Sequence, residues 1–165
     1  MKLDYFFNKV VVFAGVLSVG FVTAHANPCK TTTGLTAADK AQMLAHIDEI
    51  QNDIKAHGEE QAFQHIGEHT ERFTKGKECT FVIDRQGKWL ASVLPKQVGK
   101  NFYKVDQKLA DQFYRTATNG GGWISGFYWM DAKTHKLICK TAYITGFQHD
   151  APGECFYVGV AMPQH

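Results

Sequence analysis

The first regular pattern in the chain is an amphipathic helix that begins near residue 36. Thr36 followed by Asp39 three residues later resembles a capping box, and Gly58 is a natural end for the helix. Between these signals apolar side chains recur every three or four positions, as on one buried helix face: Met43, Ile47, Ile50 and Ile54. A second, shorter helix is predicted from residue 59 to about residue 70.

From Cys79 onward the apolar positions alternate, which predicts strands. Residues 79–93 predict a strand, a turn at the sequence DRQG and a second strand. Residues 94–106 have no period and predict a loop, and residues 107–120 predict a helix closed by Asn119-Gly120. Three further strands are expected, at 122–130, 136–146 and 154–162. This order predicts an α+β fold in which the long N-terminal helix packs on one face of a five-stranded, antiparallel-type sheet.

The first 26 residues predict a secretory signal peptide. Lys2 and Lys9 precede an uncharged apolar run, and the sequence AHA at 24–26 fits a signal peptidase site. The run is short for a membrane-spanning helix, which needs about 20 residues, so a retained anchor is the less favoured alternative. We therefore expect one domain over residues 27–165, located in the periplasm or secreted.

Charge and cysteine content exclude several classes of function. The formal net charge is only +2, which gives no basic surface for nucleic acid. The sequence contains no CxxC, so it offers no zinc ribbon, thioredoxin-type site or covalent haem. Four cysteines follow the signal segment, and in an oxidising compartment they predict two disulfides with three possible connectivities: Cys29, Cys79, Cys139 and Cys155.

The segment NGGGWISGFYWMD at 119–131 combines glycines with aromatic residues in an unusual way. Gly126 resembles an inserted residue, as in a β-bulge, which would turn Phe127 and Trp129 toward one face of the sheet. A hairpin turn through 131–136 would place Lys140 opposite Phe127. Because lysine is seldom fully buried unless paired, a bound carboxylate would suit Lys140 as a partner. An exposed lysine that protects an edge strand is the alternative.

Three segments together resemble the single Cache domain, an extracellular sensor module: FVIDRQGKWLASVLPKQVGKNF, GGGWISGFYWMDAKTHKLICKTAYI and CFYVGVA. The resemblance covers nearly all of the chain after residue 26. It implies a PAS-like sheet with the N-terminal helix on one face and, on the other, a pocket for a small metabolite, often a short carboxylate. The chain departs from the family where Ser92-Val93 replaces a common His-Pro, and where Met130 and Ala132 replace frequent prolines.

The resemblance also implies which residues contact the ligand. The implied positions are Ser92, Phe127, Trp129, Lys140 and Tyr143, and Trp123 is a further candidate. Ordinary core packing would explain the aromatic residues equally well. Strict alternation places Tyr143 on the face opposite Lys140, so either the strand is bulged there or Tyr143 belongs to the core.

A disulfide pairing follows from the same resemblance. Cys79 and Cys155 each open a strand, and in a PAS-like order we expect those strands to be parallel neighbours. The pairing Cys79–Cys155 is therefore preferred, and Cys29–Cys139 remains for the second bridge.

We expect a binding module for a small carboxylate, without catalysis, metal or cofactor, and with a membrane sensor or receptor protein as a candidate partner. The chain ends soon after its last predicted strand, so an output domain is not expected within it. One alternative is a zinc hydrolase, because HIGEH at 65–69 fits the pattern H-x-x-E-H through His65, Glu68 and His69. We interpret this match as chance, since no third ligand is evident, and His46 and His57 as surface residues. Another alternative is an interaction protein whose pocket is filled.

Overall fold

The computed structural model describes residues 29, 34–74, 78–131, 134–148 and 155–164. Its centre is a five-stranded antiparallel sheet with the spatial order β2-β1-β5-β4-β3. The strands are β1 (Cys79–Asp84), β2 (Trp89–Ser92), β3 (Gly122–Met130), β4 (Leu137–Gln148) and β5 (Cys155–Pro163). The predicted α+β fold is confirmed, while the predicted signal segment, 1–26, lies outside the described residues.

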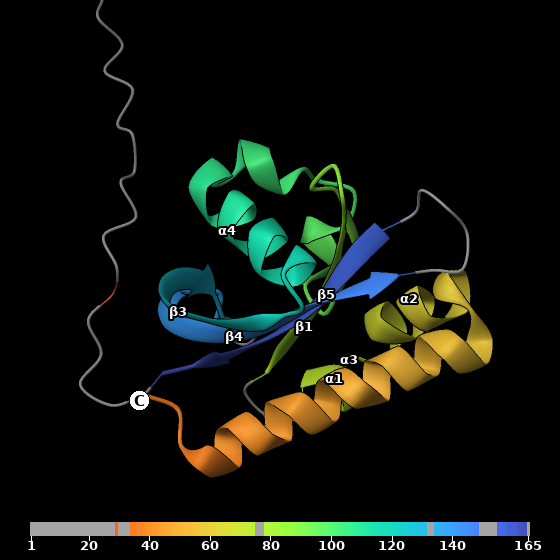
Figure 1. Cartoon of the computed structure of the whole chain (residues 1–165), viewed down its shortest axis with the longest axis horizontal. Coiled ribbons are helices and arrows are strands. Elements are labelled where there is room, and N and C mark those ends of the chain that lie inside the picture. Colours follow the sequence, from red (N-terminus) through yellow and green to blue (C-terminus); the bar gives the residue numbers. More distant parts are fainter. Residues whose placement is uncertain (1–28, 30–33, 75–77, 132–133, 149–154, 165) are drawn as a thin grey trace, which may run out of the picture.

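Helices cover both faces of the sheet, with α1 on one side and α4 on the other (Figure 1). The helices are α1 (Ala37–His57), α2 (Glu59–Glu68), α3 (Thr70–Thr74) and α4 (Gln107–Thr118), and two short 3₁₀ helices lie between β2 and α4, η1 (Pro95–Gln97) and η2 (Phe102–Lys104). The sequence prediction missed α3 and the 3₁₀ helices because short segments carry too little periodic signal. None of the helices in the described part of the chain has the length and apolarity that a membrane crossing needs.

The predicted capping box and apolar stripe of α1 are both present. The Asp39 amide donates to Thr36 Oγ1 at 3.1 Å, and the Thr36 amide donates to Asp39 Oδ2 at 2.9 Å. The stripe that begins at Met43 and ends at Ile54 is buried against the sheet. The helix ends at Gly58, whose φ of 82° only glycine adopts readily.

The two faces of the sheet carry different side chains. The face toward α1 carries Val82, Val158 and Val160, which are fully buried. We name the other side the α4 face; it carries Phe81 and Lys140, and rings from α4 and η2 pack on it. Because both faces are covered, most strand residues are buried, which explains the near-continuous apolar character of β5.

The predicted bulge in β3 is present. The register between β3 and β4 shifts between Ser125 and Phe127, and Gly126 between them has a φ of 76°. The extra residue turns the rest of the strand over, so Phe127 pairs with Lys140 as predicted. Odd-numbered residues of β3 therefore point to one face of the sheet before the bulge and to the other face after it.

One of the two predicted disulfides is confirmed and the other is wrong. Cys29 and Cys139 form a disulfide with a Cα–Cα distance of 5.8 Å, and the Cys29 amide donates to the carbonyl of Gly126. Cys79 is a free, buried thiol. The predicted Cys79–Cys155 pairing fails because β1 and β5 are antiparallel: Cys79 lies opposite Ala161, at the far end of β5 from Cys155.

Candidate functional site

Lys140 is the most unusual polar residue of the α4 face. It lies in the first third of β4, between its pairing partners Phe127 and Pro163 on the neighbouring strands. Its exposure is 0%, and its Nζ has no hydrogen-bond partner among the described residues. The alternative of a solvent-exposed edge lysine is therefore wrong: the ammonium is inside the protein, where an unpaired charge is costly.

A second buried donor lies near Lys140. Nε1 of Trp129 is also buried without an acceptor in the described part of the chain. Trp129 pairs with Ile138, two residues from Lys140, so the two side chains are diagonal neighbours on one face, with backbones about 7–8 Å apart. Two buried donors without an acceptor among the described residues make this part of the sheet complementary to a hydrogen-bond acceptor.

The rest of the α4 face is filled by aromatic rings. Neighbouring ring centroids lie 5.3–6.2 Å apart. The rings belong to Phe81, Trp89, Phe102, Phe113, Phe127 and Trp129, all of them buried. Aromatic rings are therefore present on this face, but they pack against one another and, in the described part of the chain, do not form the expected walls of a wide pocket.

Sequence reasoning named only two of these six rings as site residues. Phe81 and Phe113 carried a usable signal, since they occupy inward positions of a strand and a helix pattern. Phe102 carried none, because it belongs to a segment without any period. Its ring is placed by η2, which the sequence did not reveal.

Cys79 and Asp131 share the surroundings of Lys140. Burial raises the pKa of the Cys79 thiol, the positive charge of Lys140 opposes that rise, and the negative charge of Asp131 adds to it. Asp131 also accepts hydrogen bonds from the amide and hydroxyl of Thr134, both at 2.7 Å. The thiol is thus held in its neutral form beside a cation.

Ser92 lies on the α4 face as predicted, opposite Phe81, and is buried. Its Oγ accepts a hydrogen bond from the amide of Leu94 at 3.0 Å. The hydroxyl therefore shapes the turn out of β2.

Trp123 and Tyr143 lie on the opposite side of the sheet from Lys140. They pair across β3 and β4 before the bulge, with ring centroids 5.0 Å apart. The β4–β5 register is regular through this region, so β4 has no bulge at Tyr143. Strict alternation therefore holds, and Tyr143 packs with the core and not beside Lys140. Trp123 is 36% exposed, and the ammonium of Lys40 lies 5.6 Å from its ring centre. The structure therefore separates Trp123 and Tyr143 from the other candidates, which lie on the α4 face: Ser92, Phe127, Trp129 and Lys140.

The HIGEH segment does not assemble the alternative hydrolase site, in keeping with its interpretation as a chance match. Glu68 accepts a hydrogen bond from Gln64 at 2.7 Å on the exposed side of α2, and His69 lies just beyond the end of the helix. Nδ1 of His65 instead lies 2.9 Å from a carboxylate oxygen of Asp53 on α1. The interpretation of His46 as a surface residue is also wrong, because it is fully buried, with Nδ1 2.5 Å from Glu78 Oε2.

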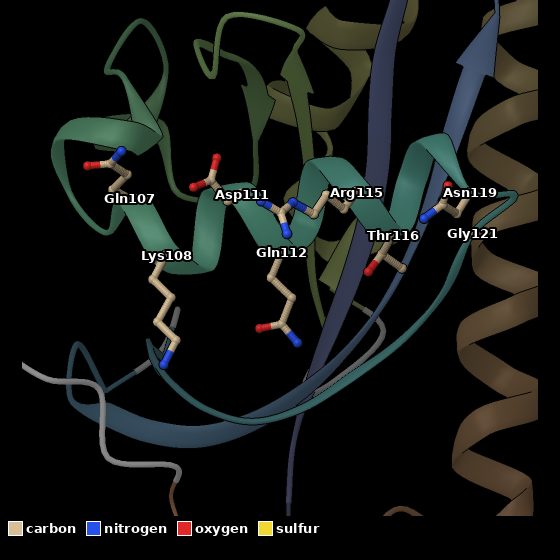
Figure 2. A pocket seen from close by; sticks show the side chains of 8 residues that line it. All are labelled: Gln107, Lys108, Asp111, Gln112, Arg115, Thr116, Asn119 and Gly121. Carbon is tan, nitrogen blue, oxygen red and sulfur yellow. The ribbon is translucent and has the colours of Figure 1, made fainter.

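A polar groove runs along the exposed side of α4, with a volume of about 860 Å³ (Figure 2). Lys108 and Gln112 extend from one side of the helix and Asp111 from the other. The lining residues are Gln107, Lys108, Asp111, Gln112, Arg115, Thr116, Asn119 and Gly121. Charges of both signs line this open groove, and none of the predicted ligand contacts does.

A smaller pocket of about 420 Å³ lies where the C-terminal end of α4 meets β4 and β5. Its lining combines aromatic rings, such as Tyr114 and Phe147, with the cation of Arg85. Sequence reasoning missed it because its residues come from four separate segments.

Comparisons with known proteins match parts of the fold. No family model matches the chain, and no curated protein matches it. Among solved structures, an extracellular ligand-binding receptor from Desulfohalobium retbaense matches 56% of this chain and 14% of its own, with 16% identity and a TM-score of 0.37. The periplasmic sensory domain of the Campylobacter jejuni chemoreceptor Tlp1 matches 61% of this chain and 34% of its own, with 20% identity and a TM-score of 0.43.

The PAS domain of Bordetella pertussis BvgS matches 55% of this chain and 79% of its own, with 11% identity and a TM-score of 0.37. This chain thus spans about a seventh and a third of the first two matched chains. All three TM-scores lie below 0.5.

Proposed function

We propose that this protein is an exported module that binds a short carboxylate, with Lys140 as its anchor. One observation carries the proposal: Nζ of Lys140 and Nε1 of Trp129 are both buried, and neither has an acceptor among the described residues. A carboxylate has two oxygens, so one ligand can accept from both donors. A hydrogen bond to a charged group is worth about 1.5–3 kcal/mol, which favours an anion over a neutral acceptor.

The packing around the two donors limits the size of the ligand. The rings of Phe127, Trp129 and Phe113 already contact one another on the α4 face. Protein interiors are close-packed, so a large ligand would have to displace these rings. We therefore expect formate, acetate or propionate to bind better than aromatic acids.

Export and signalling complete the proposal. The signal-like residues 1–26 and the resemblance to single Cache sensors support a protein that acts in the periplasm or outside the cell. We expect the mature chain to start at Asn27, which N-terminal sequencing of the exported protein will check. Binding without catalysis, and transfer of the signal to a membrane sensor or receptor protein, are part of the same proposal.

A thermal-shift screen followed by calorimetry tests the ligand. Formate, acetate and propionate should stabilise the wild-type protein by about 2.7 kcal/mol at 100 times the dissociation constant. Sodium chloride at equal ionic strength and methylammonium chloride should have no such effect. Lys140→Met, which keeps the length of the side chain without its charge, should abolish the response, and Trp129→Phe should weaken it.

Either of two results would overturn the proposal. One is the absence of any response by the wild-type protein to the short acids. The other is an equal response by wild type and Lys140→Met, which would place the ligand elsewhere, for example in the pocket beside Arg85.

A further inference from the structure

The junction of α1 and α2 brings one carboxylate and two imidazoles together. Asp53 and His57 lie one turn apart on α1, and Gly58, which both ends α1 and begins α2, reverses the chain. The reversal returns His65 of α2 to the side of Asp53. A helical hairpin thus gathers three potential metal ligands from two elements.

The distances within this cluster are short. Nδ1 of His57 lies 3.2 Å from Asp53 Oδ1, and Nδ1 of His65 lies 2.9 Å from Asp53 Oδ2. One donor atom from each of the three residues lies within 4.8 Å of the other two. In a tetrahedral site with bonds of about 2.0–2.1 Å, neighbouring donor atoms are roughly 3.3 Å apart. Small side-chain rotations therefore suffice to surround an ion.

Burial and exposure within the cluster suit a bound cation that enters from solvent. The Asp53 side chain is only 5% exposed, so its charge is poorly solvated, whereas the His57 side chain is 46% exposed and leaves an open approach. His69 lies near the cluster, with its ring centroid 5.9 Å from that of His65. His69 is not one of the three clustered residues, so water would supply the fourth ligand.

One positive charge opposes a cation at this site. Nη2 of Arg72 lies 3.9 Å from Asp53 Oδ1. Its Nε donates to Glu49 Oε1 at 2.8 Å, which directs part of the guanidinium charge to another carboxylate. Arg72 is therefore expected to weaken metal affinity without blocking the site.

We propose that Asp53, His57 and His65 form a binding site for a divalent transition metal ion of the zinc type. Two imidazoles and one carboxylate are ligands that Zn²⁺ and its neighbours prefer, whereas Ca²⁺ and Mg²⁺ prefer oxygen ligands alone. The site differs from the HIGEH pattern, of which it uses only His65. A bound ion joins α2 to the last turns of α1 and so stabilises the hairpin. The proposal concerns binding only, and it is independent of the carboxylate site on the α4 face.

Titration of the purified, untagged protein against Zn²⁺ in competition with a chromogenic chelator tests the site. We expect one Zn²⁺ ion per chain, with a dissociation constant in the micromolar range or below, and a higher melting temperature with Zn²⁺. Co²⁺ should produce the visible absorption of a tetrahedral complex. His57→Gln and Asp53→Asn should each weaken Zn²⁺ binding at least tenfold, and Arg72→Gln should strengthen it.

Two controls keep the result specific. His135→Asn removes an exposed histidine on a distant turn, and asparagine tolerates its φ of 54°, so Zn²⁺ affinity should not change. Lys140→Met should also bind Zn²⁺ as the wild type does. Because His57 is half exposed, His57→Gln should fold normally, as circular dichroism will verify. Unchanged affinity in His57→Gln, or an equal loss in His135→Asn, would overturn the proposed site.

Discussion

The buried ammonium of Lys140 carries an energetic cost unless an acceptor pairs with it. A buried donor without an acceptor costs about 1–3 kcal/mol, and more when it is charged. Its pairing partner Phe127 on the α4 face is apolar and offers it no hydrogen-bond acceptor. Cys79, which is also close to Lys140, is held as a neutral thiol by burial, so it does not neutralise the cation. Such a cost is expected where a residue serves a ligand more than it serves the fold.

Removal of this charge should therefore stabilise the protein when no ligand is present. We expect Lys140→Met to raise the free energy of unfolding by about 1–3 kcal/mol, measured by urea denaturation in a buffer without carboxylic acids. Lys136→Met, at an exposed lysine just before β4, should change it by less than about 0.5 kcal/mol. A lower stability of Lys140→Met would show that the ammonium has a partner within the folded chain.

At the scale of elements, the bulge in β3 decides which residues meet on the α4 face. If β3 alternated regularly through Gly126, with no bulge, Phe127 and Trp129 would point to the same face as Trp123 and Ser125. Gly126 makes the bulge possible because its φ of 76° is in the left-handed region. The alternating pattern therefore predicts the strand, and Gly126 predicts that the side chains after it change face.

Two glycine substitutions of opposite expected effect test this role. Gly126→Ala should lower the free energy of unfolding by about 1–2 kcal/mol, because alanine is strained in the left-handed region. Gly67→Ala should raise it by about 1 kcal/mol, because Gly67 lies in helix α2 with open space where the methyl group of alanine would lie. Denaturation curves measured in parallel will give both values. A neutral Gly126→Ala would contradict the proposed need for glycine in the bulge.

At the scale of the whole molecule, the Cys29–Cys139 disulfide joins the segment before α1 to β4. It closes a loop with a sequence separation of 110 residues, and so links the start of the domain to the hairpin that carries Lys140. Cys79 stays free because the antiparallel pairing of β1 and β5 keeps it away from Cys155. The single described disulfide is thus positioned to hold Cys29 beside the bulged strand.

Reduction should show how much the Cys29–Cys139 disulfide stabilises the folded protein. We expect reduction to lower the free energy of unfolding by about 2–5 kcal/mol, as for other disulfides that close long loops. The loss should be the same in Cys79→Ala as in wild type, and it should vanish in the double variant Cys29→Ala/Cys139→Ala. If Cys79→Ala lost its sensitivity to reductant, the bridge would involve Cys79, and the pairing described above would be wrong.

The sequence alone determined those features that depend on local chemistry. The capping box at Thr36, the apolar stripe of α1 and the bulge at Gly126 are all set by residues close together in the chain, and their patterns predicted them. The pairing of Phe127 with Lys140 followed from the same reasoning, because a hairpin fixes the register of its two strands.

Only the tertiary structure decided what depends on packing between distant segments. Alternation along a strand does not reveal the direction of its neighbour, so the sequence did not correct the expectation that β1 and β5 run parallel, which the structure shows to be wrong. An aromatic pattern in one strand also does not show whether the rings enclose a pocket or fill it. That depends on rings from other segments, such as Phe102, which packs against Trp129. The meeting of Asp53 with His65 was hidden for the same reason: contacts across a chain reversal leave no periodic trace in the sequence.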